Sequence, residues 1–173
     1  LHWVERIWDT KVYLILDGED AIVVDAAMPG RARAVLEHLA SLGRPPSAIK
    51  EIWLTHGDID HVGSTAALQD ATGARVVAHE ADVPLIEGRA DRALGPVPLA
   101  APAQRLFNGA VNHLLRYRPP RVDRALRDGD HLGDWQVIHV PGHTAGSACF
   151  YHPGRRIAIV GDALNHRRGR LGA

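Results

Sequence analysis

Three short stretches of the 173-residue sequence concentrate side chains that can bind metal ions or transfer protons. HGDIDH, at residues 56–61, places two histidines and two aspartates in one short turn. PGHTAGS at 141–147 and GDAL at 161–164 add a histidine and an aspartate, each next to a glycine. Aspartate and glycine are common in ordinary polar turns, but such turns rarely need two histidines. The combination therefore favours one metal site over three unrelated turns.

The elements before these stretches would bring them together. Strand-like residues precede each of them, at 49–55, 134–140 and 155–160. Ligands that follow different strands converge when the ends of those strands lie at one edge of a sheet. A glycine beside each ligand allows the backbone to turn sharply and to approach an ion closely.

The rest of the chain combines strands and helices within one expected domain, residues 1–173. Further strands are predicted at 2–8, 11–16, 21–26, 74–79, 121–133 and 147–152, and helices at 31–43, 63–73 and 80–87. Residues 88–123 interrupt this rhythm with a proline-containing connection and a helix at 105–117, which suits a lid or a pocket wall. Two β-rich halves would meet around the connection. Helices outside two sheets, in a layered α/β fold, are therefore expected.

The composition narrows the choice of partners and of compartment. Lys+Arg and Asp+Glu are 20 each, so no overall charge attracts nucleic acid or an anionic membrane. No apolar run approaches the ~20 residues that a membrane-spanning helix needs. The single Cys149 cannot form an internal disulfide, which fits a reducing compartment, and the cytoplasm is the expected location. A small-molecule substrate is the expected partner, and a homo-oligomer is left open.

On these residues the sequence resembles the metallo-β-lactamase superfamily, whose pattern is H-x-H-x-D-H, then a histidine after a glycine, then an aspartate after a later glycine. The resemblance runs from VVDAA, which holds Asp25, through LTHGDIDHVGS and VPGHTAGSACFY to IVGDAL. It implies a four-layer αββα sandwich with a two-metal site at one edge. A further family histidine has no counterpart before Ala173, and His166 lies too early to match. We therefore expect this sequence to lack the C-terminal portion of the sandwich, with a poorer second site as the alternative.

The resemblance also implies the site residues. Six would be ligands: His56, Asp58 and His143 for the first metal, Asp60 and His61 for the second, and Asp162 bridging both. Asp60 would also be catalytic, because it can orient the attacking water and later pass a proton to the leaving group. Asp25 and Thr144 are candidates for hydrogen bonds that hold ligand histidines in one tautomer, although both also suit ordinary turns. No substrate-binding residue is assigned.

Asp58 departs from the family, which usually has histidine at this position. Two histidines and one carboxylate serve zinc in some hydrolases and iron(II) in oxygenases. With two divalent ions and a bridging hydroxide, the carboxylate leaves the site without net charge, whereas a histidine would leave it one unit more positive. Zinc is expected by family, but a less positive site binds manganese or iron relatively better.

The expected function is hydrolysis of a small ester, thioester, lactone or related substrate by a water or hydroxide that two metal ions activate. A di-iron redox enzyme of the same fold is one alternative, because that branch carries a carboxylate near the position of Asp58. A metal-poor binding or scaffold protein is the other. β-Lactamase activity itself is not expected, because nothing in the sequence selects that substrate.

We interpret most of the other polar and aromatic residues as structural rather than functional. We expect four histidines to be surface or core residues: His79, His131, His139 and His152. Cys149 is expected to be an inert buried thiol, and the basic tail at 166–172 a solvated turn rather than a phosphate contact. Four residues suit a substrate wall and a plain core helix equally: Phe107, Leu114, Leu115 and Tyr117.

Overall fold

The computed structural model describes residues 2–7, 10–90, 117–167 and 170–172. The predicted helix at 105–117, with Phe107, Leu114 and Leu115, lies outside these residues apart from its last position. None of the helices in the described ranges is long and apolar enough to cross a membrane.

The larger sheet of the described residues carries its strands in the order β1-β2-β3-β4-β5-β6. Their bounds are β1 His2–Ile7, β2 Thr10–Asp17, β3 Asp20–Val24, β4 Ile49–Leu54, β5 Arg75–His79 and β6 Arg124–Leu126. The first three strands form the antiparallel meander that the sequence predicts, and β3 to β6 pair in parallel. Because parallel strands end at the same edge, the segments that follow β3, β4 and β5 lie close together there.

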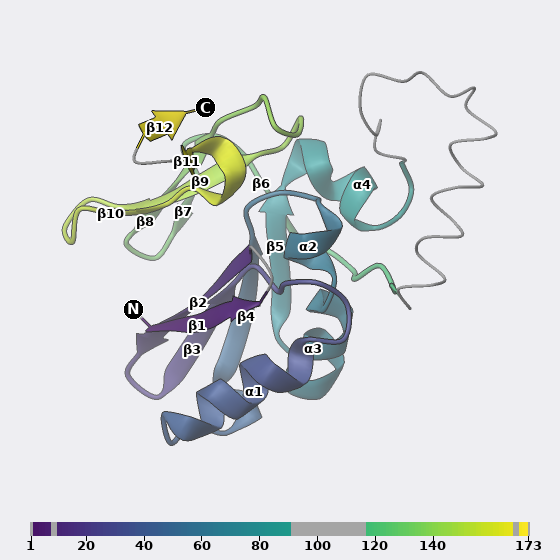
Figure 1. The fold of residues 1–173 in the computed structure, drawn as a ribbon, viewed down its shortest axis with the longest axis vertical. Coiled ribbons are helices and arrows are strands. Elements are labelled where there is room, and N and C mark those ends of the chain that lie inside the picture. Colours follow the sequence, from purple (N-terminus) through teal and green to yellow (C-terminus); the bar gives the residue numbers. More distant parts are fainter. Residues whose placement is uncertain (1, 8–9, 91–116, 168–169, 173) are drawn as a thin grey trace.

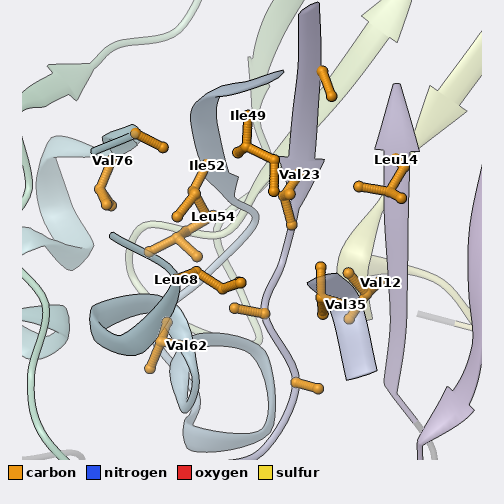
Figure 2. Close-up of a cluster of buried hydrophobic side chains, with 14 of the residues drawn as sticks. Val12, Leu14, Val23, Val35, Ile49, Ile52, Leu54, Val62, Leu68 and Val76 are labelled. Carbon is orange, nitrogen blue, oxygen red and sulfur yellow. The ribbon is translucent and has the colours of Figure 1, made fainter. Parts of the chain in front are cut away.

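Helices α1 (Ala32–Ser41) and α3 (Thr65–Thr72) cover one face of this sheet (Figure 1). The helical spacing of apolar residues at 31–43 explains α1, whose Val35 and Leu39 are fully buried. Figure 2 shows Val35 and Leu68 in the same apolar cluster as the strand residues Leu14 and Ile52. Gly73, at φ +71°, ends α3 in a left-handed conformation, as a C-terminal glycine does in many helices.

A second, antiparallel sheet packs on the opposite face of the first (Figure 1). Its order is β10-β9-β8-β7, with β7 His131–Leu132, β8 Trp135–His139, β9 Ala148–His152 and β10 Ile157–Ile159. Trp53 of β4 points into the interface, where its ring lies 5.2 Å from Phe150 and 5.9 Å from Trp135, centroid to centroid. Since side chains alternate along a strand, Ile52 and Leu54 on either side of Trp53 point to the helical face.

The predicted α/β architecture is confirmed, with helices outside two packed sheets. Three of the four sandwich layers are present in the described residues. The two β-rich halves meet in the larger sheet, which takes strands from both sides of the 88–123 connection. β6 lies after that connection but pairs with β5, because its Val77↔Arg124 register continues the parallel sheet.

The short elements also refine the predictions. The HGDIDH stretch contains a helical turn, α2 (Ile59–Val62), and the helix predicted at 80–87 is a 3-10 turn, η2 (Glu80–Asp82), followed by α4 (Val83–Ile86). Two further 3-10 turns are η1 (Pro46–Ala48) and η3 (Gly161–Ala163). The tail at 166–172 falls largely in a small hairpin, β11 (Asn165–Arg167) and β12 (Arg170–Gly172).

Candidate metal centre

His56 is the second residue after the end of β4 and is buried, at 2% exposed. The preceding Thr55 donates its main-chain N–H to Asp25 Oδ1 (2.8 Å) and its hydroxyl to Asp25 Oδ2 (2.8 Å). Thr55 Oγ1 also lies 3.0 Å from His56 Nδ1. Because the Thr55 hydroxyl proton is committed to Asp25, His56 Nδ1 must be the donor in this contact, which leaves the lone pair on Nε2.

His61 lies in α2 and receives its orientation from the same aspartate. Its Nδ1 is 2.8 Å from Asp25 Oδ2, and a carboxylate can only accept, so Nδ1 carries the proton and Nε2 faces the other way. Nε2 lies 3.4 Å from Asp162 Oδ1 and 3.6 Å from Asp60 Oδ2. Burial disfavours the charged imidazole, but Asp25, Asp162 and Asp60 outweigh it and raise the pKa of His61 to about 10.

Asp25 thus fixes two histidines, one directly and one through Thr55. It comes directly after β3, where its N–H donates to Trp53 O (2.9 Å), and its φ is +61°. The left-handed conformation costs a non-glycine residue on the order of 1 kcal/mol and is more tolerable for aspartate than for most residues. The predicted role for Asp25 therefore has a geometric basis.

The two aspartates of the HGDIDH stretch point their carboxylates in different directions. Asp58 occupies the N-cap position of α2, yet its side chain makes no capping hydrogen bond. Its Oδ2 lies instead 2.8 Å from His143 Nε2 and 3.5 Å from His56 Nε2. Asp60, whose side chain is 43% exposed, accepts a hydrogen bond from the hydroxyl of Thr10 (3.0 Å).

His143 comes from the loop between β8 and β9 of the second sheet. Ala148, at the start of β9, donates its N–H to Thr55 O (2.9 Å), so this loop is fastened to the end of β4. The ring of His143 lies 4.8 Å from that of His56, centroid to centroid, at an interplanar angle of 83°. Its side chain is about one third exposed, which leaves an approach from solvent.

Asp162 follows β10 and lies between the two groups of donors. One carboxylate oxygen is 3.4 Å from His61 Nε2 and the other is 3.7 Å from His143 Nε2. The hydrogen bond to His61 lowers the pKa of the Asp162 carboxyl. Gly161 brings it here: at φ +52°, a Cβ on this residue would lie 2.6 Å from Thr55 Oγ1.

The structure brings together all six predicted ligands, and their donor set fits divalent ions. Ligand atoms of His56, His143 and Asp162 lie within 4.8 Å of one another. His56 Nε2 is buried without a hydrogen-bond partner among the described residues, as expected for an atom that binds an ion. The carboxylates that hold a proton on His61 would equally hold a cation in its place.

Thr144 has a different partner from the expected one. Its hydroxyl donates to Asp82 (2.6 Å), a buried aspartate after β5, rather than to a ligand histidine. Asp82 and Thr10 are both absent from the sequence predictions. The sequence could have indicated Asp82, because it follows a parallel strand as Asp25 does. Thr10 could not be recognised, because it begins β2 in an ordinary turn sequence.

His79, His139 and Cys149 agree with the structural interpretations given to them. His79 is buried and accepts the N–H of Ala81, and its ring stacks on His139 with centroids 3.9 Å apart. Burial raises the pKa of the Cys149 thiol, which suits an inert cysteine. Tyr117 packs against the apolar cluster between the larger sheet and its helices (Figure 2) and donates its hydroxyl to Ile86 O (3.2 Å), which favours the core interpretation over a substrate contact.

Comparison with known proteins identifies the class that this fold and donor set define. The sequence matches the family model of the metallo-beta-lactamase superfamily over residues 7–172. The chain therefore belongs to the metallo-β-lactamase superfamily.

Individual relatives include proteins with and without a stated activity. The chain is 29% identical to the uncharacterized protein YobT of Bacillus subtilis, over 98% of this chain and 68% of that protein. It is 31% identical to a hydroxyacylglutathione hydrolase of Pseudomonas aeruginosa, over 90% of this chain and 48% of the enzyme. The crystal structure of LRA-12, a class B3 di-zinc metallo-β-lactamase from an Alaskan soil metagenome, aligns with a TM-score of 0.65 at 25% identity. That alignment covers 93% of this chain and 53% of the enzyme, so the chain spans about half of these two enzymes.

Proposed function

We propose that residues 1–173 form one domain that holds a dinuclear metal centre and hydrolyses a small ester, thioester or lactone. The observation that carries this proposal is the arrangement of the donors in two groups around Asp162. His56, Asp58 and His143 would hold the first ion, and Asp60 and His61 the second. Asp162 contacts a histidine of each group, at 3.7 Å and 3.4 Å, which suits a bridging carboxylate.

Two divalent cations at such a centre would lower the pKa of water and polarise the carbonyl oxygen of the substrate. The protein's own residues supply the rest. Asp25 and Thr55 keep the lone pairs of His56 and His61 directed inward. Thr10 holds Asp60 in a half-exposed position beside the centre. Asp60 is placed to take a proton from the attacking water and to return it to the leaving group.

Thioesters are the substrate class that the relatives favour. The Pseudomonas aeruginosa relative carries the name hydroxyacylglutathione hydrolase, which describes cleavage of an acyl thioester. For such a substrate, the water oxygen bonds to the carbonyl carbon, the carbon–sulfur bond breaks, and Asp60 transfers the proton to the departing sulfur. The products are a carboxylic acid and a thiol.

Metal content and thioesterase activity test the proposal together. We expect close to two ions per chain after growth with zinc or manganese. Release of thiol from a small acyl thioester should disappear on removal of the ions with a chelator and return when they are added back. Asp60→Asn should lower the rate of thioester cleavage by more than it lowers the metal content. A chain that holds no ion after growth in metal-replete medium would contradict the proposal and support a scaffold protein.

A di-iron redox centre is the second candidate, and Asp58 is the reason. Its carboxylate lies 2.8 Å from His143 Nε2, inside the group of donors where the family usually supplies a third histidine. Iron binds well to mixed histidine and carboxylate sites. Iron-dependent transfer of electrons from an added reductant to an added electron acceptor, without thioester cleavage, would favour this candidate over the hydrolase.

A further inference from the structure

Asp82 is a buried carboxylate that none of the ligand assignments uses. It lies in η2, directly after β5, and is 1% exposed. It occupies the N-cap position of α4, where aspartate often caps the helix, yet it makes no capping hydrogen bond. Burying a carboxylate is costly unless hydrogen bonds compensate for the lost water, so its actual partners indicate its role.

Those partners belong to the two loops that supply the first group of donors. Asp82 Oδ2 accepts the main-chain N–H of Gly57 (2.8 Å), between His56 and Asp58. Asp82 Oδ1 accepts the N–H of Gly146 (2.7 Å), and Oδ2 also accepts the hydroxyl of Thr144 (2.6 Å). One side chain therefore connects the loop after β4 with the loop between the strands of the second sheet.

Both loops reach Asp82 at a glycine, and at Gly146 the approach leaves no room for a side chain. A Cβ on Gly146 would lie 2.5 Å from the main-chain nitrogen of Asp82 and 2.7 Å from its Cβ. A Cβ on Gly57 would lie 2.7 Å from Leu85 Cδ2 and 3.4 Å from Asp82 Oδ2. At Gly146 a larger side chain would collide with the backbone of Asp82, so this loop must approach Asp82 through bare backbone, whereas at Gly57 it would displace the side chain of Leu85.

We propose that Asp82 is a positioning residue that sets the distance between these two loops and thereby the affinity of the first metal position. This inference rests on the proposed function. The first position takes His56 and Asp58 from one loop and His143 from the other, so its geometry depends on the spacing between them. The second position takes Asp60 and His61 from a single helical turn, which Thr10 and Asp25 orient independently of Asp82.

Asp82→Asn tests this dependence because it keeps the size of the side chain. An amide has one accepting oxygen, and the two carboxylate oxygens here face the N–H groups of different loops. Either orientation of the amide therefore places its NH₂ against a main-chain donor and releases one loop. Asp123→Asn is the control, because Asp123 accepts the main-chain N–H of Val76 (2.9 Å) on β5, the strand that precedes Asp82, but contacts neither loop.

The measured quantity is the cadmium affinity of each metal position, which cadmium NMR reports in the presence of a competing chelator. The first position has two histidine ligands and the second has one, so the two-histidine and one-histidine positions should give separate resonances. We expect Asp82→Asn to weaken the two-histidine position by about tenfold or more and the one-histidine position by less than about threefold. Thr144→Val, which removes one donor to Asp82, should show the same selective loss to a smaller extent, and Thr144→Ser should restore it. Asp123→Asn should change neither resonance.

Several results would overturn the inference. A variant that unfolds more easily but binds both ions as the parent does would make Asp82 purely structural. Equal weakening of both positions would also contradict it. If Asp82→Asn fails to fold, Thr144→Val decides, and unchanged binding in that variant overturns the inference. A parent chain that binds no cadmium would refute the proposed function itself, whereas the other results leave that function standing.

Discussion

Asp25→Asn is the substitution for which the structure predicts the most specific effect. Asp25 accepts three hydrogen bonds of 2.8 Å, from the N–H of Thr55, the hydroxyl of Thr55 and Nδ1 of His61. The carboxylate forces the proton of His61 onto Nδ1. Asparagine preserves the size of the side chain and tolerates the φ of +61° at this position, so the change tests the charge rather than the backbone.

The amide of the substituted residue cannot serve all three donors. If its oxygen stays with the N–H of Thr55, its NH₂ faces His61 Nδ1, which must then accept. The proton of His61 moves to Nε2, the atom that faces Asp162 and Asp60. Loss of such a supporting hydrogen bond lowers metal affinity by about ten- to a hundredfold, or about 1.4 to 2.7 kcal/mol.

The assay combines two measurements: nitrogen NMR of the histidine rings in the ion-free chain, recorded above the His61 pKa of about 10 so that the ring is neutral, and zinc competition against a chromophoric chelator. We expect the protonated nitrogen of neutral His61 to change from Nδ1 to Nε2 and the one-histidine position to lose affinity. Asp123→Asn serves again as the control for general destabilisation. An unchanged tautomer together with parental affinity at this position would refute the reasoning.

Three further substitutions test other parts of the structure. Asp58→His should shift the metal preference from manganese toward zinc, measured as the ratio of the two affinities, because it makes the site more positive. Gly161→Ala should cost about 1 to 3 kcal/mol in urea unfolding, since its Cβ would lie 2.6 Å from Thr55 Oγ1 at a φ of +52°. Burial, reinforced by His139, lowers the pKa of His79 below its ordinary 6.5, so the unfolded chain takes up this proton more readily and stability should fall as the pH drops below about 6.5. Three acidic side chains oppose this shift: Glu80, Asp82 and Asp128. His79→Asn keeps an acceptor at the start of η2 and should flatten that part of the pH profile of unfolding.

The sequence contained enough information to predict the ligand cluster because each donor follows a strand. HGDIDH, GHTAGS and GDAL lie at strand ends that the packing of the two sheets brings to one edge. The alternating and β-branched residues of 2–8, 11–16 and 21–26 likewise predicted the meander. These signals are local, since a strand and the turn after it are contiguous in the chain.

Contacts between distant segments could not be predicted in the same way. Thr10 and Asp60 are 50 positions apart, and Thr144 and Asp82 are 62 apart, so no spacing pattern connects them. The pairing of β6 with β5 depends on how the chain returns after the 88–123 connection. Periodicity within a short strand carries no information about which neighbour it will join.

The central claim is that three distant loops gather nitrogen and oxygen donors around a shared pair of cations. Anomalous X-ray scattering from crystals grown with zinc or manganese, measured at each metal edge, tests it most directly. We predict two peaks, one in contact with His56 and His143, the other in contact with His61, and Asp162 between them. Crystals grown in the presence of the metal that show no anomalous peak within bonding distance of these residues would contradict the account.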